Sequence, residues 1–139
     1  MTLSISARCQ LVAVVVCLDS LSGCSQHDGP VRYKVSGKVT VNGEPAPAFE
    51  VFFRPDSAQG NSGPGAMVRG RQGLYETRSG KGVSVGPHLV EIIAFDGIPN
   101  SESTDGNALT PKAYITTVTL PAEDSEQNFD VPASALAPK

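Results

Sequence analysis

The stretch YKVSGKVTVNG, residues 33–43, is the clearest indication of the fold. Its apolar and aromatic side chains are interleaved with lysine, serine and threonine, and this two-residue period is typical of a β-strand with one buried face. The pair Asn42-Gly43 follows at once and favours a tight turn, because both residue types tolerate a positive φ. We therefore predict a strand over residues 33–41 with a buried face made of Tyr33, Val35, Val39 and Val41.

Similar short stretches continue as far as residue 132. The segment 88–95 carries apolar residues on both faces, with Val90, Ile92 and Ala94 on one and Leu89, Ile93 and Phe95 on the other, and this predicts a central strand buried on both sides. No helical period is visible, and 14 glycines and 11 prolines favour many turns. Further strands are predicted over residues 49–54, 113–121 and 125–132, with a hairpin around 71–73 and loops over 55–65 and 96–112. The sequence predicts an all-β fold, a β-sandwich of six to eight short strands.

Residues 1–23 have the order of a secretion signal. The apolar segment LVAVVVCL, residues 11–18, is too short for a bilayer span of roughly 20 residues and suits the core of a signal peptide. The following LSGC, residues 21–24, resembles the lipobox of bacterial lipoproteins. That resemblance implies lipidation of Cys24 and cleavage next to it, with Leu21, Ser22 and Gly23 as the cleavage motif. The alternatives are a buried apolar segment with an incidental cysteine and a secreted protein without lipid.

The predicted organisation follows from this leader. We expect a lipoprotein signal peptide over 1–23, a lipidated Cys24 with a tether over 24–32, the sandwich over 33–133 and a frayed tail over 134–139. Acyl chains would anchor the protein to a membrane, because each buried methylene contributes roughly 0.8 kcal/mol. The expected location is the bacterial cell envelope, at the periplasmic or outer-membrane face.

Several motifs resemble the transthyretin-like, carboxypeptidase regulatory-like domain of small bacterial lipoproteins. They are VSGKVTVNGEPAPA, VFFRP, GLYET, GPHLVEI and the late AYITTVTLP and NFDVP, which together cover residues 35–132. The resemblance implies a seven-stranded prealbumin-like (Ig-like) sandwich, a stabilising or adhesive role and no catalysis of its own. Gln72-Gly73 stands where the family often has Asp-Gly.

Catalytic motifs are absent from the sequence, which has no nucleophile elbow, HExxH or phosphate loop. His88 is the one histidine beyond the tether, and without a partner it cannot form an acid–base pair, so we expect a structural histidine and no enzyme. Lys38, Asn128 and Glu91 invite the idea of an internal isopeptide bond. The strand alternation turns Lys38 and Asn128 toward solvent, however, whereas that reaction needs a desolvated pair.

The loop 96–107 contains Asp96, Glu102 and Asp105 but lacks the tight carboxylate spacing that calcium prefers. We therefore expect a solvated loop, no metal and no cofactor.

A basic cluster lies within thirteen residues and consists of Arg69, Arg71, Arg78 and Lys81. It could contact an anionic polysaccharide or lipid head group. The alternative is a solvated hairpin whose charges protect a sheet edge from aggregation. The overall net charge of −3 does not favour nucleic acid as a partner.

The sequence thus predicts a non-catalytic, lipid-anchored binding or structural module of the envelope. Its expected partners are the membrane, through the N-terminal lipid, and an envelope protein or polysaccharide. The alternative is an accessory subunit of an envelope peptidase, secretion or transport complex.

Overall fold

A computed structural model describes residues 29–77 and 81–138 of the chain. The predicted signal peptide, the lipobox with Cys24 and the basic residue Arg78 lie outside the described residues. The described part is built from strands and two short 3-10 helices, so the all-β prediction is confirmed. None of its helices has the length and apolar character needed to span a membrane.

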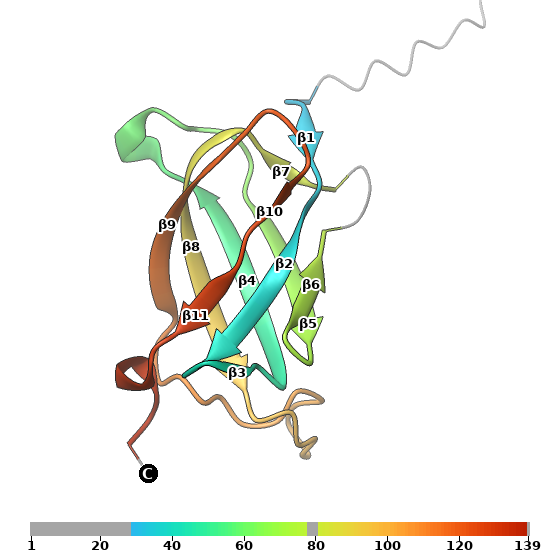
Figure 1. The fold of residues 1–139 in the computed structure, drawn as a ribbon, viewed down its shortest axis with the longest axis vertical. Helices are drawn as coiled ribbons and strands as arrows, with labels where there is room; N and C mark the ends of the chain where they lie inside the picture. The colour runs from blue at the N-terminus through green and yellow to red at the C-terminus, as the bar shows by residue number, and fades with distance from the viewer. Residues whose placement is uncertain (1–28, 78–80, 139) are drawn as a thin grey trace, which may run out of the picture.

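Eleven strands follow one another along the described chain (Figure 1). They are β1 (Arg32–Tyr33), β2 (Val35–Val41), β3 (Glu44–Pro45), β4 (Ala48–Pro55), β5 (Ala66–Arg71), β6 (Leu74–Glu76), β7 (Val83–Ser84), β8 (Gly86–Phe95), β9 (Tyr114–Leu120), β10 (Ser125–Glu126) and β11 (Phe129–Val131), with the 3-10 helices η1 (Ser57–Gln59) and η2 (Ala133–Ala135). Nine strands form one curled sheet in the order β10-β2-β6-β5-β4-β8-β9, with β11 and β3 also paired to β2. Strands β1 and β7 form a separate antiparallel pair.

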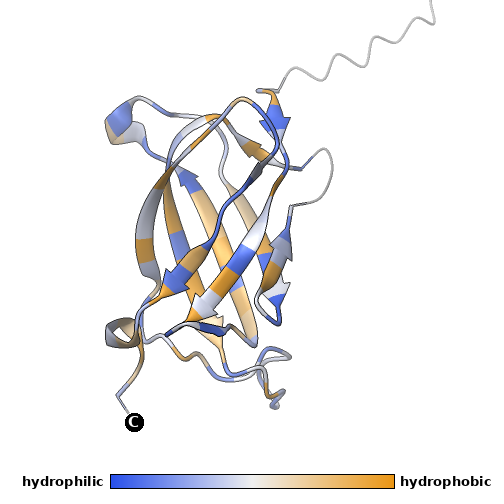
Figure 2. Ribbon diagram, in the orientation of Figure 1, coloured by the Kyte–Doolittle hydropathy of each residue, from blue (hydrophilic) through white to orange (hydrophobic). Residues whose placement is uncertain are grey.

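The longest part of the sheet consists of β4, β8 and β9, which we call the ladder side. Strand β4 pairs antiparallel with β8 from Ala48↔Phe95 to Pro55↔His88, and β8 pairs in the same way with β9. Every second side chain is buried from Phe49 to Phe53 in β4 and from His88 to Ala94 in β8, and Figure 2 shows polar residues interspersed with apolar ones along the strands. The alternation directs one set of side chains into the core, which is the physical basis of the predicted strands.

The core is enclosed by the curl of this sheet. Its aromatic centre joins β4, β6 and β11, because the ring centroids of Phe53, Tyr75 and Phe129 lie 6.3–6.4 Å from one another. Burial of each large apolar side chain contributes roughly 1.5–3 kcal/mol. The largest apolar side chains that are almost completely buried are Phe49, Phe53, Ile92, Val35, Val39, Val51, Val83, Val90 and Val131.

Two tight turns close the hairpins β2–β3 and β5–β6. The φ angles are 51° and 83° at Asn42 and Gly43, and 53° and 76° at Gln72 and Gly73. Two consecutive positive φ angles are typical of the two-residue turns that match the twist of β-hairpins. The predicted turn at 42–43 and the predicted hairpin around 71–73 are both confirmed.

The end of the chain returns to run parallel beside β2, and we call this region, β10 to β11, the C-terminal seam. Side chains of this returning segment supplement the backbone pairing. Asn128 Oδ1 accepts the Lys38 backbone N–H at 2.7 Å, and Asp124 Oδ1 accepts the Lys34 backbone N–H at 2.8 Å. The Cβ of any residue larger than glycine at position 37 would lie 1.9 Å from Gln127 O. Gly37 therefore lets the returning chain approach β2 closely.

The prediction for β8 is only half right. Val90, Ile92 and Ala94 are buried, but Leu89, Ile93 and Phe95 on the opposite face are half-buried. The reason is that β8 belongs to a sheet whose outer face is not covered by a second layer within the described ranges. Apolar residues on both faces of a strand are therefore not enough to show that both faces are covered.

The end of the chain also differs from the expected frayed tail. Ala135 and Leu136 pack against the core cluster. The backbone N–H of Ala137 donates to Leu109 O at 2.8 Å. The chain is thus held to the fold as far as residue 137, because the last residue of η2 and the residue after it pack against the core.

Candidate functional site

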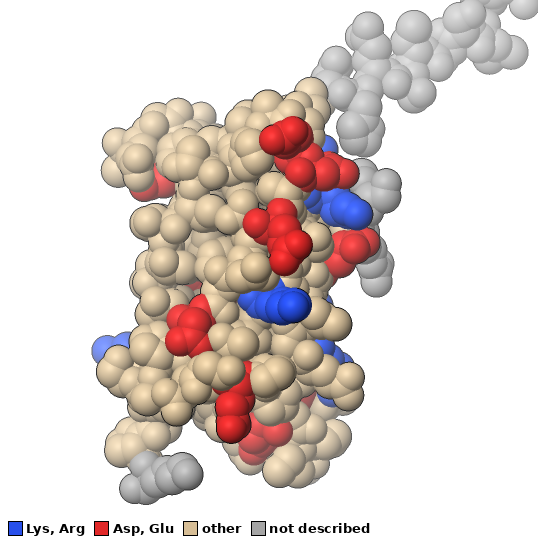
Figure 3. Space-filling model, in the orientation of Figure 1, with Lys and Arg blue, Asp and Glu red and all other residues tan. Residues whose placement is uncertain are grey.

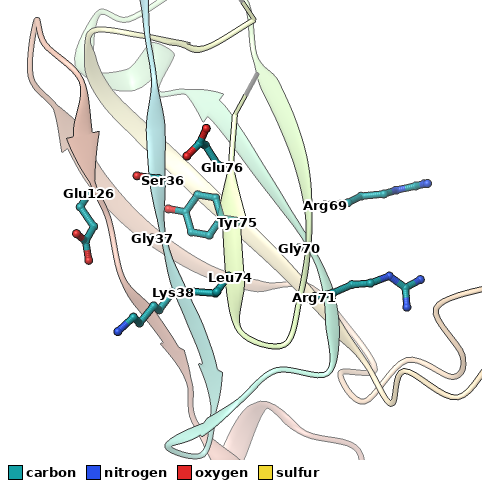
Figure 4. A pocket seen from close by; sticks show the side chains of 10 residues that line it. All are labelled: Ser36, Gly37, Lys38, Arg69, Gly70, Arg71, Leu74, Tyr75, Glu76 and Glu126. Carbon is teal, nitrogen blue, oxygen red and sulfur yellow. The ribbon is translucent and has the colours of Figure 1, made fainter. Parts of the chain in front are cut away.

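A hollow of about 700 Å³ lies over β2, β5 and β6 (Figure 4). It contains two of the four residues of the predicted basic cluster and is therefore the first candidate for ligand binding. Its lining consists of Ser36, Gly37, Lys38, Arg69, Gly70, Arg71, Leu74, Tyr75, Glu76 and Glu126.

The hollow forms because β5 and β6 diverge directly after their turn. They share a single registered pair, Arg71↔Leu74. Gly70 faces inward at this point, and a Cβ placed there would lie 2.1 Å from Cζ of Phe49. The missing side chain lets the Phe49 ring fill the space beneath the hollow, where it meets Tyr75 edge-on at a centroid distance of 6.3 Å.

The two arginines of the hollow are already paired with carboxylates of the chain. Arg69 Nε donates to Glu50 Oε1 at 2.7 Å, and Arg71 forms an ion pair with Asp105 of the loop after β8. Figure 4 shows both side chains extending away from β6. Their charges are therefore largely balanced within the chain, and they do not converge on one point of the hollow.

The structure does not bring the predicted basic cluster together. Arg69 and Arg71 lie on β5, whereas Lys81 lies beside Arg32 at a second hollow, of about 780 Å³. Arg78 is outside the described residues. On the face seen in Figure 3, acidic and basic residues are interspersed without a large area of one sign. The arrangement favours the alternative interpretation, a solvated and charge-balanced strand.

Tyr75 is the most strongly perturbed titratable group at the hollow. Its hydroxyl donates to Gln127 O at 2.7 Å and thereby ties β6 to the C-terminal seam. Burial raises the pKa of the Tyr75 hydroxyl well above its ordinary value, and the negative charge of Glu126 adds to the effect. The Tyr75 hydroxyl therefore stays protonated and donates a hydrogen bond that connects β6 to the C-terminal seam.

His88 and Ser84 form a buried pair that sequence reasoning missed. Ser84 Oγ lies 3.4 Å from His88 Nε2, and His88 Nδ1 lies 2.9 Å from Gly86 O. The relative exposures are 5% for Ser84 and 1% for His88, so a substrate cannot reach this pair in the observed state. The group next to Nδ1 is a backbone carbonyl, which leaves the ring oriented but gives no carboxylate to stabilise a charged imidazole. The hydroxyl and the ring face each other next to Gly63, where an added Cβ would lie 3.0 Å from Ser84 Oγ.

The acidic loop after β8 uses its carboxylates internally. Asp96 Oδ1 accepts the backbone N–H groups of Ile98 at 2.9 Å and Asn107 at 3.1 Å. These bonds, with a further one from the Asn107 side chain, lower the pKa of Asp96. Within residues 29–77 and 81–138, no three His, Cys, Asp or Glu side chains are grouped so as to hold a metal ion.

Lys38, Asn128 and Glu91, the three residues considered for an internal isopeptide bond, do not form a common site. Lys38 and Asn128 are both exposed, as their position in the alternation predicts. Asn128 offers its side-chain oxygen to the backbone of Lys38, and Glu91 pairs with Arg54 on the outer face of the ladder side. None of the three side chains faces a common buried space.

Comparison of the chain with protein-family models, with curated proteins and with solved structures finds no match. The lipobox Leu21, Ser22, Gly23 and Cys24 lies outside the described residues.

Proposed function

We propose that the chain is a non-catalytic module of the bacterial envelope, anchored by a lipid on Cys24 and folded as a seven-stranded, prealbumin-like β-sandwich. The observation that carries this proposal is the sequence order at the N-terminus. An eight-residue apolar core is followed by LSGC, by a short polar tether and then by β1. This is the order expected of a secreted domain that remains attached to a membrane.

Strand lengths support the seven-stranded form. Four of the eleven described strands, β1, β3, β7 and β10, have only two residues each, and the other seven have three or more. The longer strands are β2, β4, β5, β6, β8, β9 and β11. The curl of the sheet places the C-terminal seam and β2 opposite the ladder side with the aromatic core between them (Figure 1).

The chemistry of the described side chains supports a role without catalysis. Arg69, Arg71 and Arg54 each have a carboxylate partner, and the carboxylate of Asp96 holds its own loop. His88 is enclosed with Ser84. These groups stabilise the fold, and none of them combines exposure with the convergent geometry that acid–base catalysis needs.

The accessory-subunit alternative is favoured by one specific observation. Leu89, Ile93 and Phe95 line the outer face of β8, where they are only half-buried. Apolar side chains on an uncovered sheet face suit contact with another protein. In this version the anchored domain would hold a peptidase, secretion or transport component at the membrane.

Fractionation of cells that express the full chain tests the anchor. We expect the wild-type chain in the membrane fraction and Cys24→Ser in the soluble envelope fraction or retained as an uncleaved precursor. Cys17→Ser is the matched control, because it changes the same atom within the predicted leader and should leave localisation unchanged. Membrane association of a Cys24→Ser chain from which residues 1–23 have been removed would overturn the proposed anchor.

A further inference from the structure

Exposed apolar side chains lie at the end of the domain where the described chain begins and on the neighbouring start of β5, where Met67 lines the same hollow as Val31. Val31 has a relative exposure of 68%, Val85 of 47% and Met67 of 50%. These are half of the six large apolar side chains that are exposed in the described part. We call this end, which carries β1 and β7 in Figure 1, the tether end.

The three side chains belong to one surface. Strands β1 and β7 pair with Arg32 opposite Ser84, and Val31 and Val85 are the residues that directly flank this pair beyond the strand ends. Val31 and Met67 line the second hollow, together with Pro30 and Ala66. A contiguous apolar group of this kind differs from isolated exposed residues, which are common on soluble proteins.

The length of the tether determines what this surface meets. Only four residues lie between Cys24 and Gly29, and an extended chain over these five Cα–Cα steps spans at most about 18 Å. The ten residues of β8 extend over roughly 30 Å, so the opposite end of the domain, with the loop that contains Ile98, can lie much farther from the anchor. If Cys24 is acylated, the tether end must therefore remain close to the bilayer.

Charges at this end do not favour one kind of lipid. Arg32 and Lys81 lie at the second hollow. Glu123 and Asp124 precede β10, and Asp124 contacts the backbone of Lys34 just after β1. Basic and acidic groups thus largely offset one another, which leaves the apolar side chains to determine the contact.

We propose that Val31, Met67 and Val85 form a membrane-contacting surface that inserts into the interfacial region of the bilayer carrying the lipid anchor. This inference rests on the proposed function, since it requires acylation of Cys24. Shallow insertion of a few apolar side chains is too weak to retain a free protein, but next to an anchor it fixes orientation. The domain then stands with the β2–β3 turn and the loop after β8 directed away from the membrane.

Fluorescence quenching in vesicles tests the orientation. The full chain is acylated in a bacterial host and reconstituted in vesicles of phosphatidylethanolamine and phosphatidylglycerol that contain nitroxide-labelled acyl chains. A fluorophore is attached to a single free thiol introduced by Val85→Cys or, as the matched control, by Ile98→Cys. We expect about threefold stronger quenching at position 85 than at position 98, because interfacial insertion reaches only roughly 5–10 Å. Equal quenching at the two positions, or stronger quenching at 98, overturns the inference.

A charge substitution tests the surface itself. Val31→Asp combined with Met67→Asp should lower quenching of the label at 85 to the level seen at 98. Leu74→Asp, an equally drastic change at an exposed apolar residue of the β5–β6 hairpin, should leave it unchanged. Unchanged quenching in the double variant overturns the assigned surface.

The intact mass of the same sample distinguishes a failure of the proposed lipid anchor from a failure of the proposed contact surface. A mass without acyl groups overturns the anchor and, with it, the contact surface. A mass with acyl groups and no preferential quenching at position 85 overturns the contact surface alone.

Discussion

The ladder side and the C-terminal seam are held together in different ways. On the ladder side, β4, β8 and β9 form long antiparallel ladders with uninterrupted register. At the seam, β10 and β11 pair with β2 over only two and three residues, and the connection depends on Asn128, Asp124 and Asp130 as side-chain acceptors. Long backbone ladders therefore stabilise the ladder side, whereas at the seam side-chain acceptors supplement a short backbone pairing.

The two regions meet at the aromatic centre. Phe53 of β4 contacts both Tyr75 and Phe129, and the Tyr75 hydroxyl reaches the seam at Gln127. Substitutions can therefore be chosen to disturb both regions together, the seam alone, or a single hydrogen bond of the seam.

Phe53→Ala should have the largest effect, because it removes the ring that connects both regions. Phe53 is 1% exposed, and truncating such a side chain costs about 3–5 kcal/mol of unfolding free energy. The control is Phe52→Ala on the opposite face of the same strand, where the side chain is half-buried. Chemical denaturation of both variants should show a much smaller loss for Phe52→Ala, and equal losses would contradict the assigned core.

Gly37→Ala should disturb the seam and spare the ladder side. Its Cβ would lie 1.9 Å from the backbone oxygen of Gln127, and overpacking of this kind costs about 1–3 kcal/mol. Hydrogen exchange should accelerate at β10 and β11 while β8 keeps its protection. Gly29→Ala is the control, because nothing lies within 4 Å of the position that its Cβ would occupy. Uniform acceleration in both regions would show that the two are one cooperative unit.

Tyr75→Phe should weaken one tie of the seam by about 1 kcal/mol, the usual net value of a hydrogen bond. It should also change the response to alkali. The pKa of Tyr75 is raised in the folded state, so its stabilising contribution is complete below pH 10, where the unfolded tyrosine titrates, and is lost as the pH rises further. Denaturation midpoints between pH 9 and 11 should fall less steeply in Tyr75→Phe than in wild type, and an equal slope in the two proteins would contradict the role assigned to the Tyr75 hydroxyl.

Asp130→Asn should have the smallest effect, and its loss of stability should be larger near neutral pH than in acid. Asp130 Oδ1 accepts the Thr40 hydroxyl at 2.5 Å and the Gly43 backbone N–H at 3.0 Å, and these bonds lower its pKa. The resulting stabilisation is present above the pKa of the unfolded carboxyl and is lost as the pH falls through the lower folded value. Denaturation between pH 5 and 2 should therefore show a weaker acid dependence in the variant, and parallel curves would contradict the assignment.

The sequence predicted the regions that local pattern controls. Alternation along residues 33–41 and the Asn42-Gly43 pair led to β2 and its turn, because strand period and turn chemistry are local properties. The same reasoning placed Phe129 and Val131 toward the core. The sequence could not predict whether the outer face of β8 is covered, since that depends on whether another layer packs against the sheet.

The candidate site was predictable only in part. Arg69 and Arg71 were recognised as neighbours, but their carboxylate partners Glu50 and Asp105 lie 19 and 34 residues away in the sequence. The pair Ser84 and His88 carries no recognisable motif, because the bend at Val85 between β7 and β8 creates it. The seam likewise depends on contacts between residues 90 positions apart, such as Lys38 and Asn128.

The central claim is that this domain is held at a membrane by a lipid on Cys24. The most direct measurement is the intact mass of the full-length gene product purified from bacterial membranes. The proposal predicts a chain that begins at Cys24 and carries the added mass of acyl groups. An unmodified chain that retains residues 1–23 would contradict it.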